Sequence, residues 1–186
     1  MSPYAIRAGT LVKKGDYKGA VADFTRGLEL GAGNAALYSR MWASLYANDG
    51  KAASADAQKL LQTDLSENQR PYVLIAGYLG LRKQNKVAEA SAFLRVALKQ
   101  PNDISWPTQV MRFLLADLPE KQLIQLATDN DKATEARAYI GMMKILTGDS
   151  SSATLHFEWV KANGNKTFAE YDLALAELSR MPRASQ

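Results

Sequence analysis

The chain has 186 residues, of which 47% are hydrophobic and 23% charged, a balance that suits one folded domain. Cysteine is absent, which excludes disulfides, a thiolate nucleophile and cysteine-bound zinc. No apolar run approaches the roughly 18 residues that a membrane-spanning helix needs, so we expect no membrane span.

The first two predicted helices, residues 4–14 and 17–30, form a hairpin. Gly15 between them suits the left-handed conformation that often ends a helix. Asp16 stands where a side-chain oxygen can accept a hydrogen bond from the free N–H groups of the next helix. Apolar side chains then recur at helical spacing, at Ala20, Val21, Phe24 and Leu28. The pattern predicts two helices that pack against each other.

Looser copies of this hairpin follow along the chain. Four further hairpins are predicted: residues 34–61, residues 72–100, a hairpin that begins at residue 105, and residues 135–164. A last single helix is predicted over residues 167–180. The fourth hairpin is degenerate, because Pro119 ends its first helix and leaves only a short partner helix from Glu120. The last helix has no partner after it and is interpreted as a C-terminal cap, and residues 182–186 are expected to be a disordered tail.

Small residues recur where the two helices of each hairpin cross, at Ala20, Ala53, Ala90 and Ala153. The first two intervals are similar in length, whereas the interval from Ala90 to Ala153 is nearly twice as long, which indicates one eroded repeat between them. Repeats of this length are typical of a solenoid, in which each unit buries its apolar face by stacking on its neighbours.

The first hairpin resembles the tetratricopeptide repeat (TPR), a helical hairpin of about 34 residues. The slots of that family are filled in order by Tyr4, Ala8, Leu11, Gly15, Asp16, Ala20, Phe24, Gly27 and Leu30. Ala32 stands where the family has its closing proline. The resemblance implies an all-α fold, a right-handed superhelix of about five helical hairpins plus the C-terminal capping helix, as a single domain over residues 1–181.

The segment from Trp106 onward is similar to the C-terminal region of the NlpI-type bacterial TPR lipoproteins. The similarity is carried by Trp106-Pro107, by the run EARAYIGMMKILTGDSSSATLHF and by KTFAEYDLALAELSRM. It implies a bacterial cell-envelope or periplasmic adaptor that forms a homodimer and docks peptidoglycan-processing enzymes or proteases. The missing cysteine departs from this family, because it removes the site of lipid attachment.

The concave groove of a TPR solenoid is lined by the first helix of each hairpin, and this resemblance places six candidate partner-binding residues there: Lys13, Ser39, Tyr46, Tyr72, Arg82 and Lys83. Ala5 and Gly9 fall on lining slots of the first hairpin. Aromatic rings and arginine suit a surface that binds peptide. In the alternative interpretation, Tyr46, Tyr72 and Leu79 pack between the hairpins instead.

Nothing in the sequence favours an enzyme, and we expect no catalytic residue, cofactor or metal. His156 is the only histidine, and we interpret it as a surface residue because no nucleophile motif lies near it. Residues 129–131 resemble the start of a calcium loop, but Thr134 stands where the loop requires glycine.

The sequence therefore favours a non-enzymatic adaptor that binds a protein or peptide. Residues 1–100 hold 14 Lys and Arg against 8 Asp and Glu, which suits either an acidic partner or an ordinary solvated helix surface. The alternative is a helical-repeat protein that binds nucleic acid. Against this alternative, residues 101–186 hold 9 basic and 11 acidic residues, and no dense Lys/Arg stripe is present.

Overall fold

The structure is a computed structural model that describes residues 2–98 and 103–181. Within those residues every regular element is an α-helix, so the prediction of an all-α fold is confirmed. The chain divides into two compact units, Met1–Asp103 and Ile104–Gln186. The expectation of one solenoid domain over residues 1–181 stays a prediction, and the expected tail at residues 182–186 lies outside the described residues.

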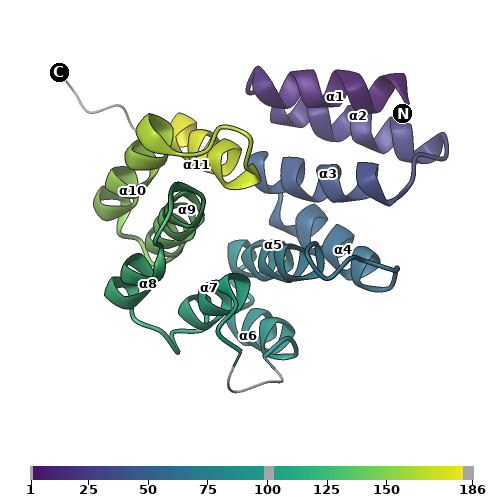
Figure 1. Cartoon of the computed structure of the whole chain (residues 1–186). Coiled ribbons are helices and arrows are strands. Elements are labelled where there is room, and N and C mark those ends of the chain that lie inside the picture. The colour runs from purple at the N-terminus through teal and green to yellow at the C-terminus, as the bar shows by residue number, and fades with distance from the viewer. Residues whose placement is uncertain (1, 99–102, 182–186) are drawn as a thin grey trace. The chain divides into compact units, whose positions relative to one another are not determined.

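In the first unit the described residues form six helices: α1 (Pro3–Lys13), α2 (Tyr17–Glu29), α3 (Asn34–Tyr46), α4 (Gly50–Leu61), α5 (Arg70–Lys83) and α6 (Val87–Arg95). Each helix packs on the next in the chain, and α3 also contacts α5 (Figure 1). Helix α6 ends at Arg95, before the predicted Gln100, and residues 99–102 are not described.

The core of the first three helices is built from small residues around one large ring. Phe24 is 5% exposed and packs with Ala8, Ala20, Ala36 and Ala43. Alanine at these positions lets the helices approach closely, and the Phe24 ring fills the remaining space. The predicted small slots at the later hairpins are also buried: Ala53, Ala90 and Ala153 are each 0% exposed.

Helices α4 and α5 cross at two glycines. A Cβ added to Gly80 would lie 2.7 Å from the Gly50 carbonyl oxygen and 2.9 Å from the Ser54 nitrogen, so backbone occupies the place of a side chain. Gln84 closes the crossing, because its Nε2 donates hydrogen bonds to the carbonyl oxygens of Gly50 (3.2 Å) and Gly80 (3.0 Å) and to the Ser54 hydroxyl (3.0 Å).

Six connections between successive helices share one backbone turn. Each contains a residue with positive φ: Gly15 (78°), Gly31 (87°), Asn48 (63°), Asn85 (61°), Ala116 (61°) and Gly148 (86°). The residue after it donates its N–H to the carbonyl five residues earlier, as Asp16 does to Leu11 (2.9 Å) and Asp149 to Lys144 (2.9 Å). This Schellman arrangement satisfies the carbonyls at the end of a helix. Gly31 joins the first hairpin to the second, and the other five turns lie within the hairpins. These five follow one another at nearly even intervals, so the same turn is present in the degenerate fourth hairpin.

Three of these turns are followed by an aspartate that caps the next helix. Its carboxylate accepts a hydrogen bond from a backbone N–H in the first helical turn: Asp16 from Gly19 (2.9 Å), Asp49 from Ala52 (2.9 Å) and Asp149 from Ser152 (3.1 Å). The side-chain oxygen thereby satisfies a donor that has no partner inside the helix. The predicted cap at Asp16 is confirmed.

In the second unit the described residues form five helices: α7 (Trp106–Leu114), α8 (Glu120–Leu126), α9 (Asn130–Leu146), α10 (Ser150–Asn163) and α11 (Ala169–Arg180). Helix α9 packs against each of the other four. Met142 on α9 is 0% exposed, as expected for a residue covered by neighbouring helices. A Cβ added to Gly141 on α9 would lie 2.5 Å from the Phe157 ring of α10, so a side chain there would have to displace that ring.

Candidate functional site

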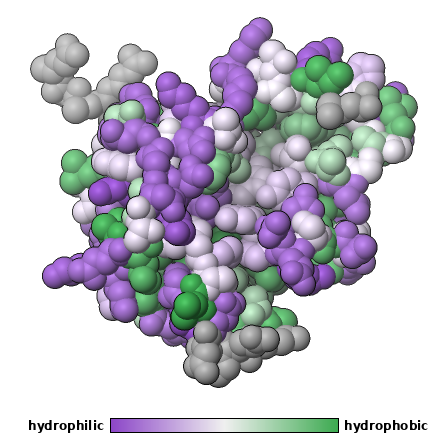
Figure 2. All heavy atoms as spheres, viewed as in Figure 1, coloured by the Kyte–Doolittle hydropathy of each residue, from purple (hydrophilic) through white to green (hydrophobic). Residues whose placement is uncertain are grey.

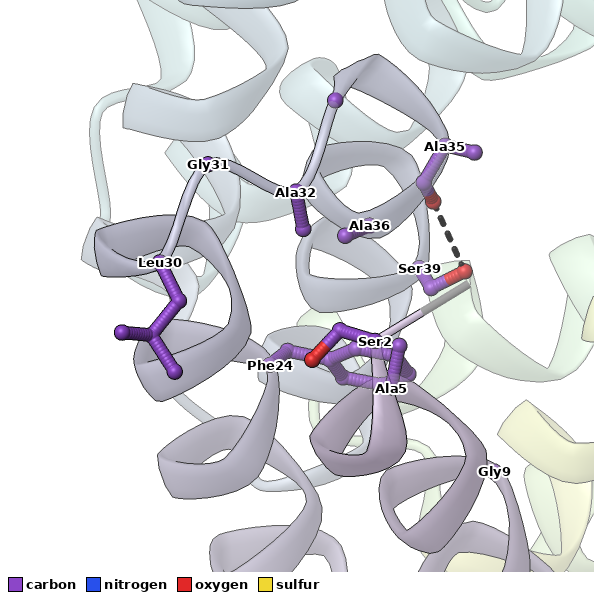
Figure 3. A pocket seen from close by; sticks show the side chains of 11 residues that line it. Ser2, Ala5, Gly9, Phe24, Leu30, Gly31, Ala32, Ala35, Ala36 and Ser39 are labelled. Carbon is purple, nitrogen blue, oxygen red and sulfur yellow. Dashed lines mark hydrogen bonds between the residues drawn. The ribbon is translucent and has the colours of Figure 1, made fainter.

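The first unit contains a hollow of about 680 Å³ between α1, the end of α2, the connection to α3, and α3 itself. Figure 3 shows the Phe24 ring at its inner wall, between the two flanking helices. The residues that line it are Ser2, Ala5, Gly9, Phe24, Leu30, Gly31, Ala32, Gly33, Ala35, Ala36 and Ser39. The hollow therefore includes three of the positions that TPR resemblance placed on the concave face, namely Ala5, Gly9 and Ser39.

Small side chains leave this space open. On α1 the lining residues Ala5 and Gly9 are four residues apart, and on α3 so are Ala35 and Ser39, so each pair lies on one face of its helix. A Cβ added to Gly9 would meet nothing within 4 Å. Glycine in the middle of a helix costs about 0.5–1 kcal/mol relative to alanine. Packing within the chain does not require Gly9, whereas the close approach of another molecule would benefit from it.

The chemistry of the hollow suits an apolar group. None of the lining residues has a charged side chain. The Ser39 hydroxyl donates a hydrogen bond to the Ala35 carbonyl (3.0 Å), as Figure 3 shows, which occupies its proton within the helix. The hollow thus offers hydrophobic contact and open backbone, and its lining holds no acid, base or nucleophile arranged for catalysis.

Tyr46, one of the six predicted groove residues, lies in the core. It is 3% exposed, and its ring centroid lies 5.5 Å from that of Tyr17 and 6.3 Å from that of Trp42. Tyr46 therefore cannot offer its ring to a partner, and the alternative interpretation, packing between hairpins, is correct for this residue. Leu79 is likewise 0% exposed.

The other predicted groove residues are distributed over the first unit. Lys13 is exposed in the last turn of α1, and Tyr72 is half-buried near the start of α5. Arg82 is half-buried, and its Nη1 donates to the Tyr78 hydroxyl at 2.6 Å, with the guanidinium 5.6 Å from the centre of that ring. Lys83 donates from Nζ to Asn48 Oδ1 at 2.7 Å. Of the six, Ser39 is a lining residue of the hollow.

The same arginine–aspartate ion pair is present in the first and the second hairpin, and the sequence analysis did not predict it. Arg7 on α1 binds Asp23 on α2 through both nitrogens of its fork (2.5 and 2.6 Å), and Arg40 binds Asp56 in the same way (2.8 and 2.7 Å). The Arg7 guanidinium holds the pKa of Asp23 below its usual value. Arg40 also donates to Thr25 at 3.0 Å, which links the first hairpin to the second. The signal was available, because the arginine and the aspartate have the same sequence separation in both hairpins.

His156 differs from the predicted surface histidine. His156 lies on α10, and its side chain is only 13% exposed. Its Nε2 lies 3.4 Å from a carboxylate oxygen of Glu120. In the part of the chain that the structure describes, no group of three or more His, Cys, Asp or Glu side chains is placed to hold a metal ion. Residues 129–131 serve as a helix start instead, since Asp129 accepts the Lys132 N–H at 2.8 Å.

Large hydrophobic side chains are exposed at separate points of the surface. They are Ile6, Leu30, Val87, Val96, Ile104, Leu126 and Leu155. Figure 2 shows that on the viewed face hydrophobic residues form small groups among hydrophilic ones. Scattered exposed residues of this kind are normal for a folded chain, so the hollow beside Phe24 remains the more specific candidate site.

No described helix combines the length and the apolar character required to cross a bilayer. A comparison with models of known protein families found no family whose model matches the chain. The candidate site is defined by the structure alone, from the repeated hairpins and the uncharged hollow between α1 and α3.

Proposed function

We propose that this chain is a TPR-like helical-repeat adaptor that binds a segment of a partner protein on the first unit, with an apolar side chain of the partner in the hollow beside Phe24. The observation that carries the proposal is the hollow itself, about 680 Å³ lined by uncharged and mostly small residues. Its lining positions Ala5, Gly9 and Ser39 coincide with concave-face slots of the TPR resemblance.

The repeated turns support the TPR-like part of the proposal. Within the hairpins, residues with positive φ recur at nearly even intervals, and each is followed by the same hydrogen bond back into the preceding helix. Such a chain builds a surface from equivalent helix faces, and surfaces of this kind hold extended or helical protein segments.

The expected character of the partner follows from the lining and the charge around it. An apolar anchor suits the uncharged hollow, and the excess of basic residues in the first half of the chain suits acidic residues elsewhere on the same segment. Desolvated apolar contacts dominate affinity in most interfaces, whereas exposed charges act mainly on the association rate.

The proposal is tested with peptides selected on the wild-type chain from a random phage-displayed library. Affinity is then measured by fluorescence anisotropy for wild type, Gly9→Leu and Thr10→Leu. Leucine at position 9 occupies the hollow and is expected to weaken binding at least about tenfold, a change of about 1.4 kcal/mol. Thr10 is exposed on the neighbouring face of α1, so Thr10→Leu is the matched control and should bind as wild type does.

Equal affinity of wild type and Gly9→Leu would contradict the hollow as the site. Failure to select any peptide, together with salt-dependent binding of single-stranded RNA, would favour the nucleic-acid alternative instead.

The similarity to NlpI-type lipoproteins supports two further parts of the proposal: an adaptor role in the bacterial cell envelope, and a homodimer. Sedimentation equilibrium tests the second part directly. A molecular mass that stays at the monomer value of 20.4 kDa as the concentration rises would exclude the homodimer.

A further inference from the structure

Three side chains join the short helix α8 to its neighbours in the second unit. Glu120, at the start of α8, places one carboxylate oxygen 3.0 Å from Lys144 Nζ on α9 and the other 3.4 Å from His156 Nε2 on α10. Glu120 thus makes polar contacts with both long helices, while Leu123 of α8 is fully buried. One of the two polar partners titrates near neutral pH.

The surroundings of His156 disfavour its protonated form. Its side chain is 13% exposed, and its Nδ1 is buried with no hydrogen-bond partner among the described residues. The charged groups that face it are Glu120 from α8 and two cations from α9, Lys144 and Arg137, the latter 4.6 Å from the centre of the Trp159 ring. Burial lowers the pKa of His156 below 6.5, and the two cations add to this, while Glu120 opposes it.

Protonation of His156 therefore changes the number of hydrogen-bond acceptors that its ring requires. The neutral ring needs one N–H, which a carboxylate facing Nε2 keeps on that nitrogen. The protonated ring carries a second N–H at Nδ1, which has no acceptor where it lies, and a buried charged donor without a partner is costly. Rotation of the ring into water removes this cost but separates His156 from Glu120.

We propose that His156 makes the attachment of α8 sensitive to pH: the neutral ring holds α8 through Glu120, and protonation of the ring releases α8 from α9 and α10. Release of α8 would also change a hollow beside it. Glu120 and Lys144 also line a hollow of about 320 Å³ between α7, α8 and α9, beside the apolar side chains of Leu118 and Ile140. Movement of α8 would widen this hollow and uncover apolar surface.

Hydrogen exchange of the full chain, measured by mass spectrometry, tests the proposal. After correction for the intrinsic effect of pH on exchange, the α8 segment of wild type should exchange up to about tenfold faster at about pH 5.5 than at about pH 7.5. The limit follows from linkage: one site with an ordinary pKa of about 6.5 when released favours release at most about tenfold at that lower pH. Helix α3, in the other unit, is the internal control and should not change.

His156→Gln is the decisive variant, because the glutamine amide can donate to Glu120 but cannot titrate. Its α8 segment should show the same protection at both pH values. An acid effect of equal size in wild type and His156→Gln would overturn the proposal, and so would unchanged α8 protection in wild type.

A second measurement does not depend on a variant. Since His156 is the only histidine, its ring signals in an NMR titration are unambiguous. Their midpoint should lie below pH 6.5 and coincide with shifts of the α8 amide signals. A midpoint above this value, or α8 signals that do not follow it, would contradict the proposal.

Discussion

At the scale of single residues, the second unit buries a carboxylic acid. The Tyr139 hydroxyl donates a hydrogen bond to Glu170 on α11, and the two residues are 0% and 4% exposed. Burial raises the pKa of Glu170 above its ordinary value, and the hydrogen bond from Tyr139 opposes this rise. Because the folded state holds this proton more tightly, the contribution of Glu170 to stability is greatest below the unfolded pKa and is lost as the pH rises through the folded value.

Replacing this acid by its neutral amide should therefore remove a pH dependence. We expect Glu170→Gln to keep the hydrogen bond from Tyr139 and to flatten the fall in unfolding free energy as the pH rises above about 4.5. Tyr139→Phe should instead destabilise by about 1–3 kcal/mol, because it leaves a buried polar group without its partner. Urea unfolding across this pH range measures both.

Tyr171→Phe is the control for the loss of a hydroxyl, because Tyr171 is half-buried on the same helix as Glu170. It should change the unfolding free energy little. A fall in stability with rising pH that is equally steep in Glu170→Gln and wild type would show that this carboxyl is not its source.

At the scale of helices, two glycines occupy helix interiors for different reasons. Gly80 lies where α5 meets the backbone of α4, and a Cβ there would approach Gly50 and Ser54 closer than side chains do. Gly9 lies on α1 with open space before it. The identical substitution at the two sites thus separates helix packing from helix propensity.

We expect Gly80→Ala to destabilise the chain by about 1–3 kcal/mol, because backbone atoms cannot yield without separating α4 from α5. Gly9→Ala should stabilise it by about 0.5–1 kcal/mol, because alanine is the better helix former and meets no neighbour. Thermal or urea unfolding measures both changes. A loss of stability in Gly9→Ala would mean that the hollow is not open in solution.

The crossing of α9 and α10 provides a similar test in the second unit. Gly141→Leu places its side chain against the Phe157 ring, where a Cβ alone would lie at 2.5 Å, and should destabilise by about 1–3 kcal/mol. Ala20→Leu is expected to do the same in the first unit, because Ala20 is 0% exposed beside Phe24. Should both variants melt as wild type does, the helix crossings described here would be incorrect.

At the scale of the whole molecule, the helices pack within two compact units: those of the first unit pack mainly on their neighbours in the chain, and those of the second unit pack around α9. In arrays of this kind stability is close to a sum of local terms and nearest-neighbour interfaces. The effect of a core substitution is therefore expected to remain near its site.

Hydrogen exchange of the two core variants should show this locality. Gly80→Ala is expected to speed exchange most in α4 and α5, and Gly141→Leu most in α9 and α10, with smaller effects in the other unit. The two variants serve as controls for each other. Equal acceleration over the whole chain in either variant would indicate that the chain unfolds as one cooperative body.

Much of the architecture was accessible from local patterns. Helical periodicity, the glycine and aspartate of the turns and the recurrence of small residues predicted the all-α fold and the positions of most helices. These signals act within a few residues of the chain, so they can be read without knowing what packs where. Ser39, one of the residues predicted to bind a partner, lines the hollow.

The sequence did not predict which candidate side chains are buried, because burial depends on helices that are distant in sequence. Tyr46 has the residue type of a binding surface, but Tyr17 and Trp42 enclose it in the core. His156 was expected at the surface, yet Glu120, from an earlier helix of the same unit, lies against it across a helix interface. The hollow beside Phe24 arises from space that small residues on two helices leave open. Periodicity identifies the face of a helix, and only the packed structure determines whether that face is covered, paired or empty.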